Sequence, residues 1–150
     1  MLFRSWPHDH PLYPDPKLVV RELGLEDRVV FTGGIPEEDK APLLSAATAF
    51  AFPSLYEGFG LPVVESMARG VPVLASTTPA VAETAGDAAL LVDPEDVAAI
   101  AEGLVRALAD RSLRDDLVAK GTARAALFSW EATARATLNA YRDAMERARA

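Results

Sequence analysis

Residues 49–76 read AFAFPSLYEGFGLPVVESMARGVPVLAS, and the order of elements within this stretch decides the fold. Short apolar runs at residues 49–53 and 71–76 have the composition and length of buried strands. Between them, residues 62–69 are predicted to form a helix that ends at Gly70, because glycine favours the end of a helix. A strand, a helix and a second strand in this order indicate two parallel strands joined by a crossover helix.

The alternation of strands and helices extends over the rest of the chain. Further strands are expected at residues 28–32 and 88–92, each of them short and apolar. Unbroken apolar strands separated by helices are typical of a parallel sheet that is covered on both faces. We therefore predict an α/β fold with about four parallel strands, helices on both faces and a helical C-terminal segment. The remaining helices are expected at residues 17–23, 36–48, 81–84 and 95–109, and then after the capping residues Ser112 and Ser129.

The composition is that of an acidic globular domain. The 150 residues include 15 Lys and Arg against 22 Asp and Glu, which gives a formal net charge of −7, and half of the chain is apolar. This charge argues against a nucleic-acid partner, because phosphate backbones favour clustered Lys and Arg. The chain has no cysteine, which excludes disulfide and thiolate chemistry.

Residues 1–16 contain four of the eleven prolines, and they are predicted to form a proline-rich arm ahead of a domain over residues 17–150. No stretch approaches the roughly 18 consecutive apolar residues of a membrane span, and the apolar part of residues 1–6 is too short for a signal peptide. We therefore expect a cytoplasmic protein. His8 and His10 form an H-x-H pair that lacks the third and fourth ligands of a zinc site, so no metal is expected.

The loop at residues 54–61 is the candidate binding site. In open α/β sheets, ligands bind at the carboxyl ends of the strands, where loops lead into helices. Gly58 and Gly60 allow backbone N–H groups to approach a ligand, and the start of the following helix attracts an anion such as a phosphate. Glu57 lies just before the glycines, and Glu65 lies eight residues later, about one turn into the helix.

The two glutamates indicate what kind of ligand this loop could hold. A carboxylate repels a phosphate, and an ionised carboxylate only accepts hydrogen bonds, so its natural partners are hydroxyl groups. Carboxylates on both sides of an anion-binding turn therefore fit a nucleoside diphosphate sugar, which has sugar hydroxyls on both sides of its phosphates. The alternative is that Glu65 is a solvated acid and that the glycines only form a turn. The spacing alone leaves both interpretations open.

Several segments of the chain, in order, resemble the nucleotide-sugar-binding half of the family-four glycosyltransferases. The resemblance covers residues 28–141, and its core is the EGFG turn with Glu57, seven intervening residues and Glu65. It implies the GT-B fold, in which two Rossmann-like domains face each other, with this chain as a partial C-terminal domain. The matching segments are RVVFTGGIP, FPSLYEGFGLPVVESMARGVPVLAS, VAETAGDAALLVDPED and FSWEATARATLNAYRDA.

The resemblance implies transfer of a glycosyl group from a UDP-, GDP- or ADP-sugar to an acceptor, with retention of configuration and without a metal. It implies that Glu57 is the catalytic residue in contact with the sugar hydroxyls, and that Glu65 accepts hydrogen bonds from the ribose. It also implies a base pocket at Gly34 and Ile35. The backbone amides that hold the sugar and the diphosphate would be those of Gly58, Phe59, Gly60 and Leu61.

Parts of the family's pattern have no match in this sequence. Two strands, an Arg and a Lys that clamp the diphosphate, and the N-terminal acceptor-binding domain are not found, so we expect a truncated chain that is inactive alone. The alternative function is a non-catalytic fragment that keeps the fold. The gap in the sheet would close by a shifted pairing, by a strand from residues 1–6, or by strand exchange in a homo-oligomer. An acceptor lipid would place the protein at the inner face of a membrane.

Overall fold

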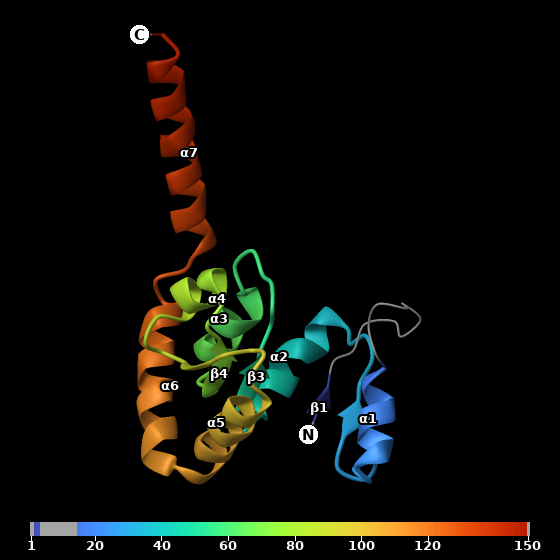
Figure 1. The fold of residues 1–150 in the computed structure, drawn as a ribbon. Coiled ribbons are helices and arrows are strands. Elements are labelled where there is room, and N and C mark those ends of the chain that lie inside the picture. The colour runs from blue at the N-terminus through green and yellow to red at the C-terminus, as the bar shows by residue number, and fades with distance from the viewer. Residues whose placement is uncertain (1, 4–14, 150) are drawn as a thin grey trace. The chain divides into compact units, whose positions relative to one another are not determined.

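The computed structural model describes residues 2–3 and 15–149 (Figure 1). The chain divides into two compact units between Pro42 and Leu43. Most of the predicted arm at residues 1–16, including His8 and His10, lies outside the described residues. Every strand pair among the described residues is parallel. The predicted α/β class is therefore confirmed, whereas a single domain over residues 17–150 stays a prediction.

The first unit contains a two-stranded parallel sheet, in which β1 (Leu2–Phe3) pairs with β2 (Val30–Phe31). The N-terminal residues thus contribute a strand, but within the described residues this pair forms a sheet of its own, so the closure of the expected gap in the sheet stays a prediction. The helix α1 (Pro16–Glu22) has a proline in its first turn, and the Asp15 carboxylate accepts a hydrogen bond of 2.9 Å from the Lys17 backbone N–H. A helix start of this kind satisfies an otherwise unpaired N–H group.

The helix α2 (Glu37–Ser45) begins in the first unit and ends in the second. Three acids occupy its first turn, where the helix dipole favours negative charge, as the sequence predicts. The helix ends three residues before the predicted boundary at residue 48. It has no buried residue.

A three-stranded parallel sheet forms the centre of the second unit. Its middle strand is β4 (Val73–Ser76), and all four residues of this strand are buried, which explains why this run of the sequence is apolar throughout. The neighbouring strands are β3 (Phe50–Phe52) on one side and β5 (Leu90–Val92) on the other. The helices of this unit are α3 (Leu61–Ala68), α4 (Pro79–Ala85), α5 (Val97–Ala109), α6 (Arg111–Ala125) and α7 (Trp130–Arg147).

Helices cover both faces of this sheet, as predicted. Side chains alternate along a strand, so Val73 and Ala75 lie on one face, where they pack in a core with α3 and α4. Leu74 lies on the other face, where α5 packs. A Cβ atom on Gly103 of α5 would lie only 2.5 Å from Leu74 Cδ1, so glycine allows α5 to approach the sheet closely. The strands and the helices α3 to α6 therefore form the scaffold of the second unit.

The helix caps agree with the sequence at one predicted position and differ at another. The Ser129 hydroxyl accepts a hydrogen bond of 3.1 Å from the Ala132 N–H at the start of α7, which confirms that prediction. The prediction of Ser112 as the cap of α6 is wrong. Asp110 caps this helix instead, because its carboxylate accepts from the Leu113 N–H at 3.0 Å and adds a favourable charge at the helix N-terminus.

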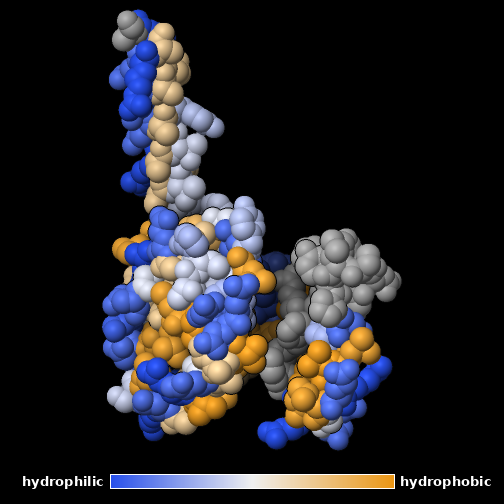
Figure 2. Space-filling view, viewed as in Figure 1, coloured by the Kyte–Doolittle hydropathy of each residue, from blue (hydrophilic) through white to orange (hydrophobic). Residues whose placement is uncertain are grey.

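The long helix α7 differs from the other helices of its unit because none of its residues is buried. A pale apolar stripe runs along it in Figure 2. Its large apolar side chains, all of them exposed, are Trp130, Leu138, Tyr141 and Met145. No residue of α7 therefore belongs to the buried core of the second unit.

Candidate functional site

The loop at residues 53–60 joins the C-terminal end of β3 to the start of α3 (Figure 1). This is the edge of a parallel sheet at which ligands bind in α/β folds. The side chains of the loop are largely exposed, with Tyr56 at 90% and Leu55 at 64% of their full accessibility. A solvent-exposed loop on a buried sheet is suited to presenting backbone groups to a ligand.

Glu57 is held within this loop by a neighbouring hydroxyl group. The Ser54 Oγ atom lies 3.0 Å from Glu57 Oε1 and 3.2 Å from the Tyr56 carbonyl oxygen, with Ser54 as the donor in both contacts. The Glu57 side chain is half-buried. A carboxylate has acceptor capacity for several hydrogen bonds, so the bond from Ser54 orients Glu57 and leaves it able to accept others.

Glu65 lies on α3, four residues after the first helical residue, Leu61, whereas Glu57 lies four residues before it. Glu65 is also half-buried. Its backbone carbonyl accepts a hydrogen bond of 2.8 Å from the Arg69 guanidinium. Glu57 therefore precedes the N-terminus of α3 and Glu65 lies in the second turn of this helix, and both residues are half-buried.

The backbone conformation requires glycine at one of the two glycine positions in the loop but not at the other. Gly60 is buried, precedes α3 and has a φ of 89°, a left-handed conformation that side chains rarely adopt. Gly58 has no such φ angle, and a Cβ atom placed on it would have no neighbour within 4 Å. The fold therefore explains Gly60, but neither the backbone conformation nor the packing explains Gly58.

Phe59 of the loop is held by contacts with α4 and with the segment that follows α6. The buried Thr84 hydroxyl of α4 donates a hydrogen bond of 2.7 Å to the Phe59 carbonyl oxygen. The Phe59 ring meets the Phe128 ring edge to face, with 5.4 Å between the ring centroids. Arg124 of α6 lies over the Phe128 ring, 5.2 Å from its centroid. The sequence does not indicate these partners, because they are at least 25 residues away from the Phe59 position and have no local motif.

The remaining predicted site residues, Gly34 and Ile35, belong to the first unit and lie between β2 and α2. Gly34 is exposed and Ile35 is half-buried. The preceding Gly33 has a φ of 63°, which accounts for the glycine at that position. The structure thus groups Glu57, Gly58, Phe59, Gly60, Leu61 and Glu65 in the second unit.

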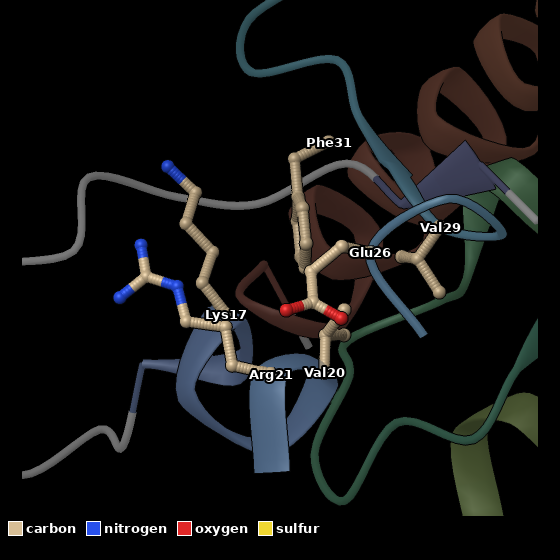
Figure 3. A pocket seen from close by; sticks show the side chains of 6 residues that line it. All are labelled: Lys17, Val20, Arg21, Glu26, Val29 and Phe31. Atoms are coloured by element: carbon tan, nitrogen blue, oxygen red, sulfur yellow. The ribbon is translucent and has the colours of Figure 1, made fainter. Parts of the chain in front are cut away.

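A small pocket of about 170 Å³ lies within the first unit (Figure 3). Lys17 and Arg21 extend from α1 at one side of it, and the Lys17 Nζ atom lies 5.8 Å from the centroid of the Phe31 ring. The other lining residues are Val20, Glu26 and Val29. Drug-sized ligands usually occupy sites of roughly 300–1,000 Å³, and none of the predicted site residues lines this pocket.

Two further findings concern metal ions and membranes. Residues 2–3 and 15–149 contain no cluster of three or more His, Cys, Asp or Glu side chains that could hold a metal ion. Within the same ranges, no helix combines the length and the apolar character that a membrane span requires.

Comparisons with known proteins relate this chain to enzymes of sugar transfer. A family model described as "Glycosyl transferases group 1" matches residues 15–124. The O-antigen chain mannosyltransferase B of Escherichia coli is 44% identical over 117 residues, which are 78% of this chain and 31% of that protein. The structure of sucrose-phosphate synthase from Thermosynechococcus elongatus matches 97% of this chain and 38% of that one, with a TM-score of 0.79 and 36% identity.

A further solved structure is the HepE protein of Anabaena, in complex with UDP-glucose. It matches 75% of this chain and 31% of that one, with a TM-score of 0.69 and 26% identity. The chain therefore spans about a third of the length of these relatives. The family model covers well over half of the chain and includes the β3–α3 loop with both glutamates. On this evidence the chain belongs to the group 1 glycosyl transferases, and its α/β fold matches the GT-B enzymes of that family.

Proposed function

We propose that this chain is the donor-binding half of a retaining glycosyltransferase, and that the β3–α3 loop binds a nucleoside diphosphate sugar. The observation that carries the proposal is the pair of half-buried carboxylates, Glu57 and Glu65, on either side of the N-terminus of α3. The family match and the HepE structure, which was solved with UDP-glucose, support the choice of ligand.

The loop supplies the two kinds of interaction that such a donor needs. The helix N-terminus and the backbone amides of residues 58–61 attract the diphosphate, because they carry partial positive charge. Glu57 accepts hydrogen bonds from the transferred sugar, and Glu65 accepts them from the ribose. Gly58 supports this assignment, since the lack of a side chain there allows close approach of a ligand to the backbone. Gly34 and Ile35 are proposed to contact the base.

In the proposed reaction, the bond between the anomeric carbon of the sugar and the diphosphate breaks, and a bond to an acceptor hydroxyl oxygen forms on the same face. Negative charge grows on the departing diphosphate, and the diphosphate takes up the proton that the acceptor hydroxyl loses. The amides at the start of α3 stabilise this charge because they are already oriented before the reaction. The acceptor is proposed to bind to a separate domain, so transfer requires more than this chain.

The test is a calorimetric titration of the 150-residue chain with UDP-, GDP- and ADP-sugars, with and without EDTA. We expect saturable micromolar binding of one of them in both conditions. Glu65→Gln removes the charged acceptor at the ribose and should weaken this binding about tenfold or more, as expected for a lost charge-assisted hydrogen bond. The matched control is Glu102→Gln on the exposed surface of α5, which should leave the affinity unchanged.

The second candidate is a non-catalytic fragment that keeps the fold but does not bind the donor. One observation favours it. Residues 54–65 include no Lys or Arg, so this segment has no basic side chain to neutralise the diphosphate. The nearby Arg69 donates to the Glu65 carbonyl, and Arg124 donates to backbone carbonyls of α4. If no nucleotide sugar binds at millimolar concentration, this second function is the correct one.

A further inference from the structure

The peptide bond between Phe59 and Gly60 is held from one side by a buried hydroxyl group. The Thr84 side chain on α4 is only 3% exposed, and its Oγ1 atom donates a 2.7 Å hydrogen bond to the Phe59 carbonyl oxygen. In a planar trans peptide, the N–H group points in the direction opposite to the carbonyl group. The bond from Thr84 therefore directs the Gly60 N–H away from α4, toward the other side of the loop.

The hydrogen bond from Thr84 matters because the Phe59–Gly60 peptide could otherwise rotate about the backbone bonds on either side of it. Glycine adopts positive and negative φ angles about equally well, so sterics alone do not keep Gly60 at its φ of 89°. A rotation of the Phe59–Gly60 peptide would turn the Gly60 N–H toward α4. An external hydrogen bond to the Phe59 carbonyl opposes that rotation.

Thr84 is itself held by Arg124 of α6. The Arg124 Nε atom donates to the Thr84 carbonyl at 2.9 Å, and its Nη2 atom donates to the Glu83 carbonyl at 2.6 Å. These carbonyls lie at the C-terminus of α4, where the helix dipole favours a cation. Arg124 also lies over the Phe128 ring, which contacts the Phe59 ring. The carbonyl and the ring of Phe59 are thus both supported from the α4 and α6 side.

We propose that Thr84 is a positioning residue that fixes the orientation of the Phe59–Gly60 peptide, with Arg124 holding Thr84 in place. The orientation itself is a property of the loop. Its consequence, a Gly60 N–H aimed at the donor diphosphate, depends on the function proposed above. Thr84 does not touch the donor and acts only through the peptide that it binds.

The experiment uses the full chain and three variants. Thr84→Val keeps the shape of the side chain and removes the donor hydroxyl, whereas Thr84→Ser keeps the hydroxyl. Thr122→Val is the matched control, because the Thr122 hydroxyl bonds only to a carbonyl of its own helix, α6. Backbone ¹⁵N relaxation measured residue by residue by NMR reports on the mobility of the loop, and calorimetry reports on donor affinity.

We expect Thr84→Val to lower the backbone order parameters of Phe59 and Gly60 from about 0.85, which is typical of a rigid backbone, to below about 0.6. The order parameters of β4 and β5 should not change, and donor affinity should fall about fivefold, the factor that corresponds to one ordinary hydrogen bond. Thr84→Ser should restore both quantities, and Thr122→Val should change neither.

The proposal is overturned if Thr84→Val leaves the order parameters of the loop unchanged, or if they fall equally throughout the second unit, which would indicate a general loss of order. It is also overturned if Thr84→Ser fails to restore the order parameters. A parent chain that binds no nucleotide sugar would contradict the proposed function, and ¹⁵N relaxation would still decide whether Thr84 orients the peptide.

Discussion

The two units of this chain differ in their content of buried residues. In the second unit, β4 is completely buried, and the core around it is drawn from α3, α4 and α6. In the first unit, neither α1 nor the two-residue strand β2 contains a buried residue. Among the described residues, all the buried apolar side chains belong to the second unit. The loop with the two glutamates is therefore attached to the part of the chain that has its own core, and a rigid scaffold is what preorganised binding requires.

The largest expected effect is on the free energy of unfolding, and it compares a buried residue of the second unit with an exposed residue of the first. Leu74→Ala removes a fully buried side chain from the central strand and should lower the free energy of unfolding by about 3 kcal/mol. Val30→Ala, in β2 of the first unit, changes a side chain that is 56% exposed and should cost less than about 1 kcal/mol. Urea denaturation followed by circular dichroism measures both values. Equal losses for the two variants would contradict the comparison between the units.

A smaller effect separates stability from binding within the loop. Gly60→Ala forces a side chain into a left-handed conformation and should destabilise the second unit by about 1–2 kcal/mol. Gly58→Ala meets no neighbouring atom and no positive φ, so it should change stability by less than about 0.5 kcal/mol.

The Gly58→Ala variant should affect the affinity for the donor and not the stability of the chain. A methyl group on the exposed face of the loop would obstruct a ligand that approaches the backbone, so Gly58→Ala should weaken nucleotide-sugar binding about tenfold or more at unchanged melting temperature. If Gly58→Ala binds as tightly as the parent, the glycine only shapes a turn, which is the alternative interpretation of the motif.

The smallest expected effect concerns the cap of α6. Asp110→Ala removes the carboxylate that accepts the Leu113 N–H and should cost about 1 kcal/mol. Ser112→Ala, the position that the sequence pattern favours, lies inside the helix and should cost less than about 0.5 kcal/mol. Thermal unfolding of the two variants checks this order, and the reverse order would restore Ser112 as the cap.

Much of this architecture could be predicted from the sequence because the relevant signals are local. The strand at β4 is a short unbroken apolar run, and Glu57, the two glycines and Glu65 lie within one segment of nine residues. The sequence predicts the wrong cap for α6 because two residues with capping side chains lie close together, and the pattern does not decide between Asp110 and Ser112.

Other features could not be predicted because they depend on contacts between distant residues. The hydrogen bond from Thr84 to Phe59 spans 25 residues, and the bond from Arg124 to Thr84 spans 40. β1 is only two residues long, and its pairing with β2 has no periodic signal in a proline-rich segment. Thr84 and Arg124 belong to no local sequence motif, so only the fold shows which residues they contact.

The central claim is that the β3–α3 loop binds a nucleoside diphosphate sugar, and amide chemical shifts test it most directly. The uniformly ¹⁵N-labelled chain is titrated with UDP-, GDP- and ADP-sugars, and the shift of each backbone amide is followed. We predict that the largest changes occur at Gly58, Gly60 and Leu61 and saturate with the affinity measured by calorimetry. Changes that gather instead at Lys17 and Phe31 in the first unit, or no changes at millimolar ligand, would contradict the claim.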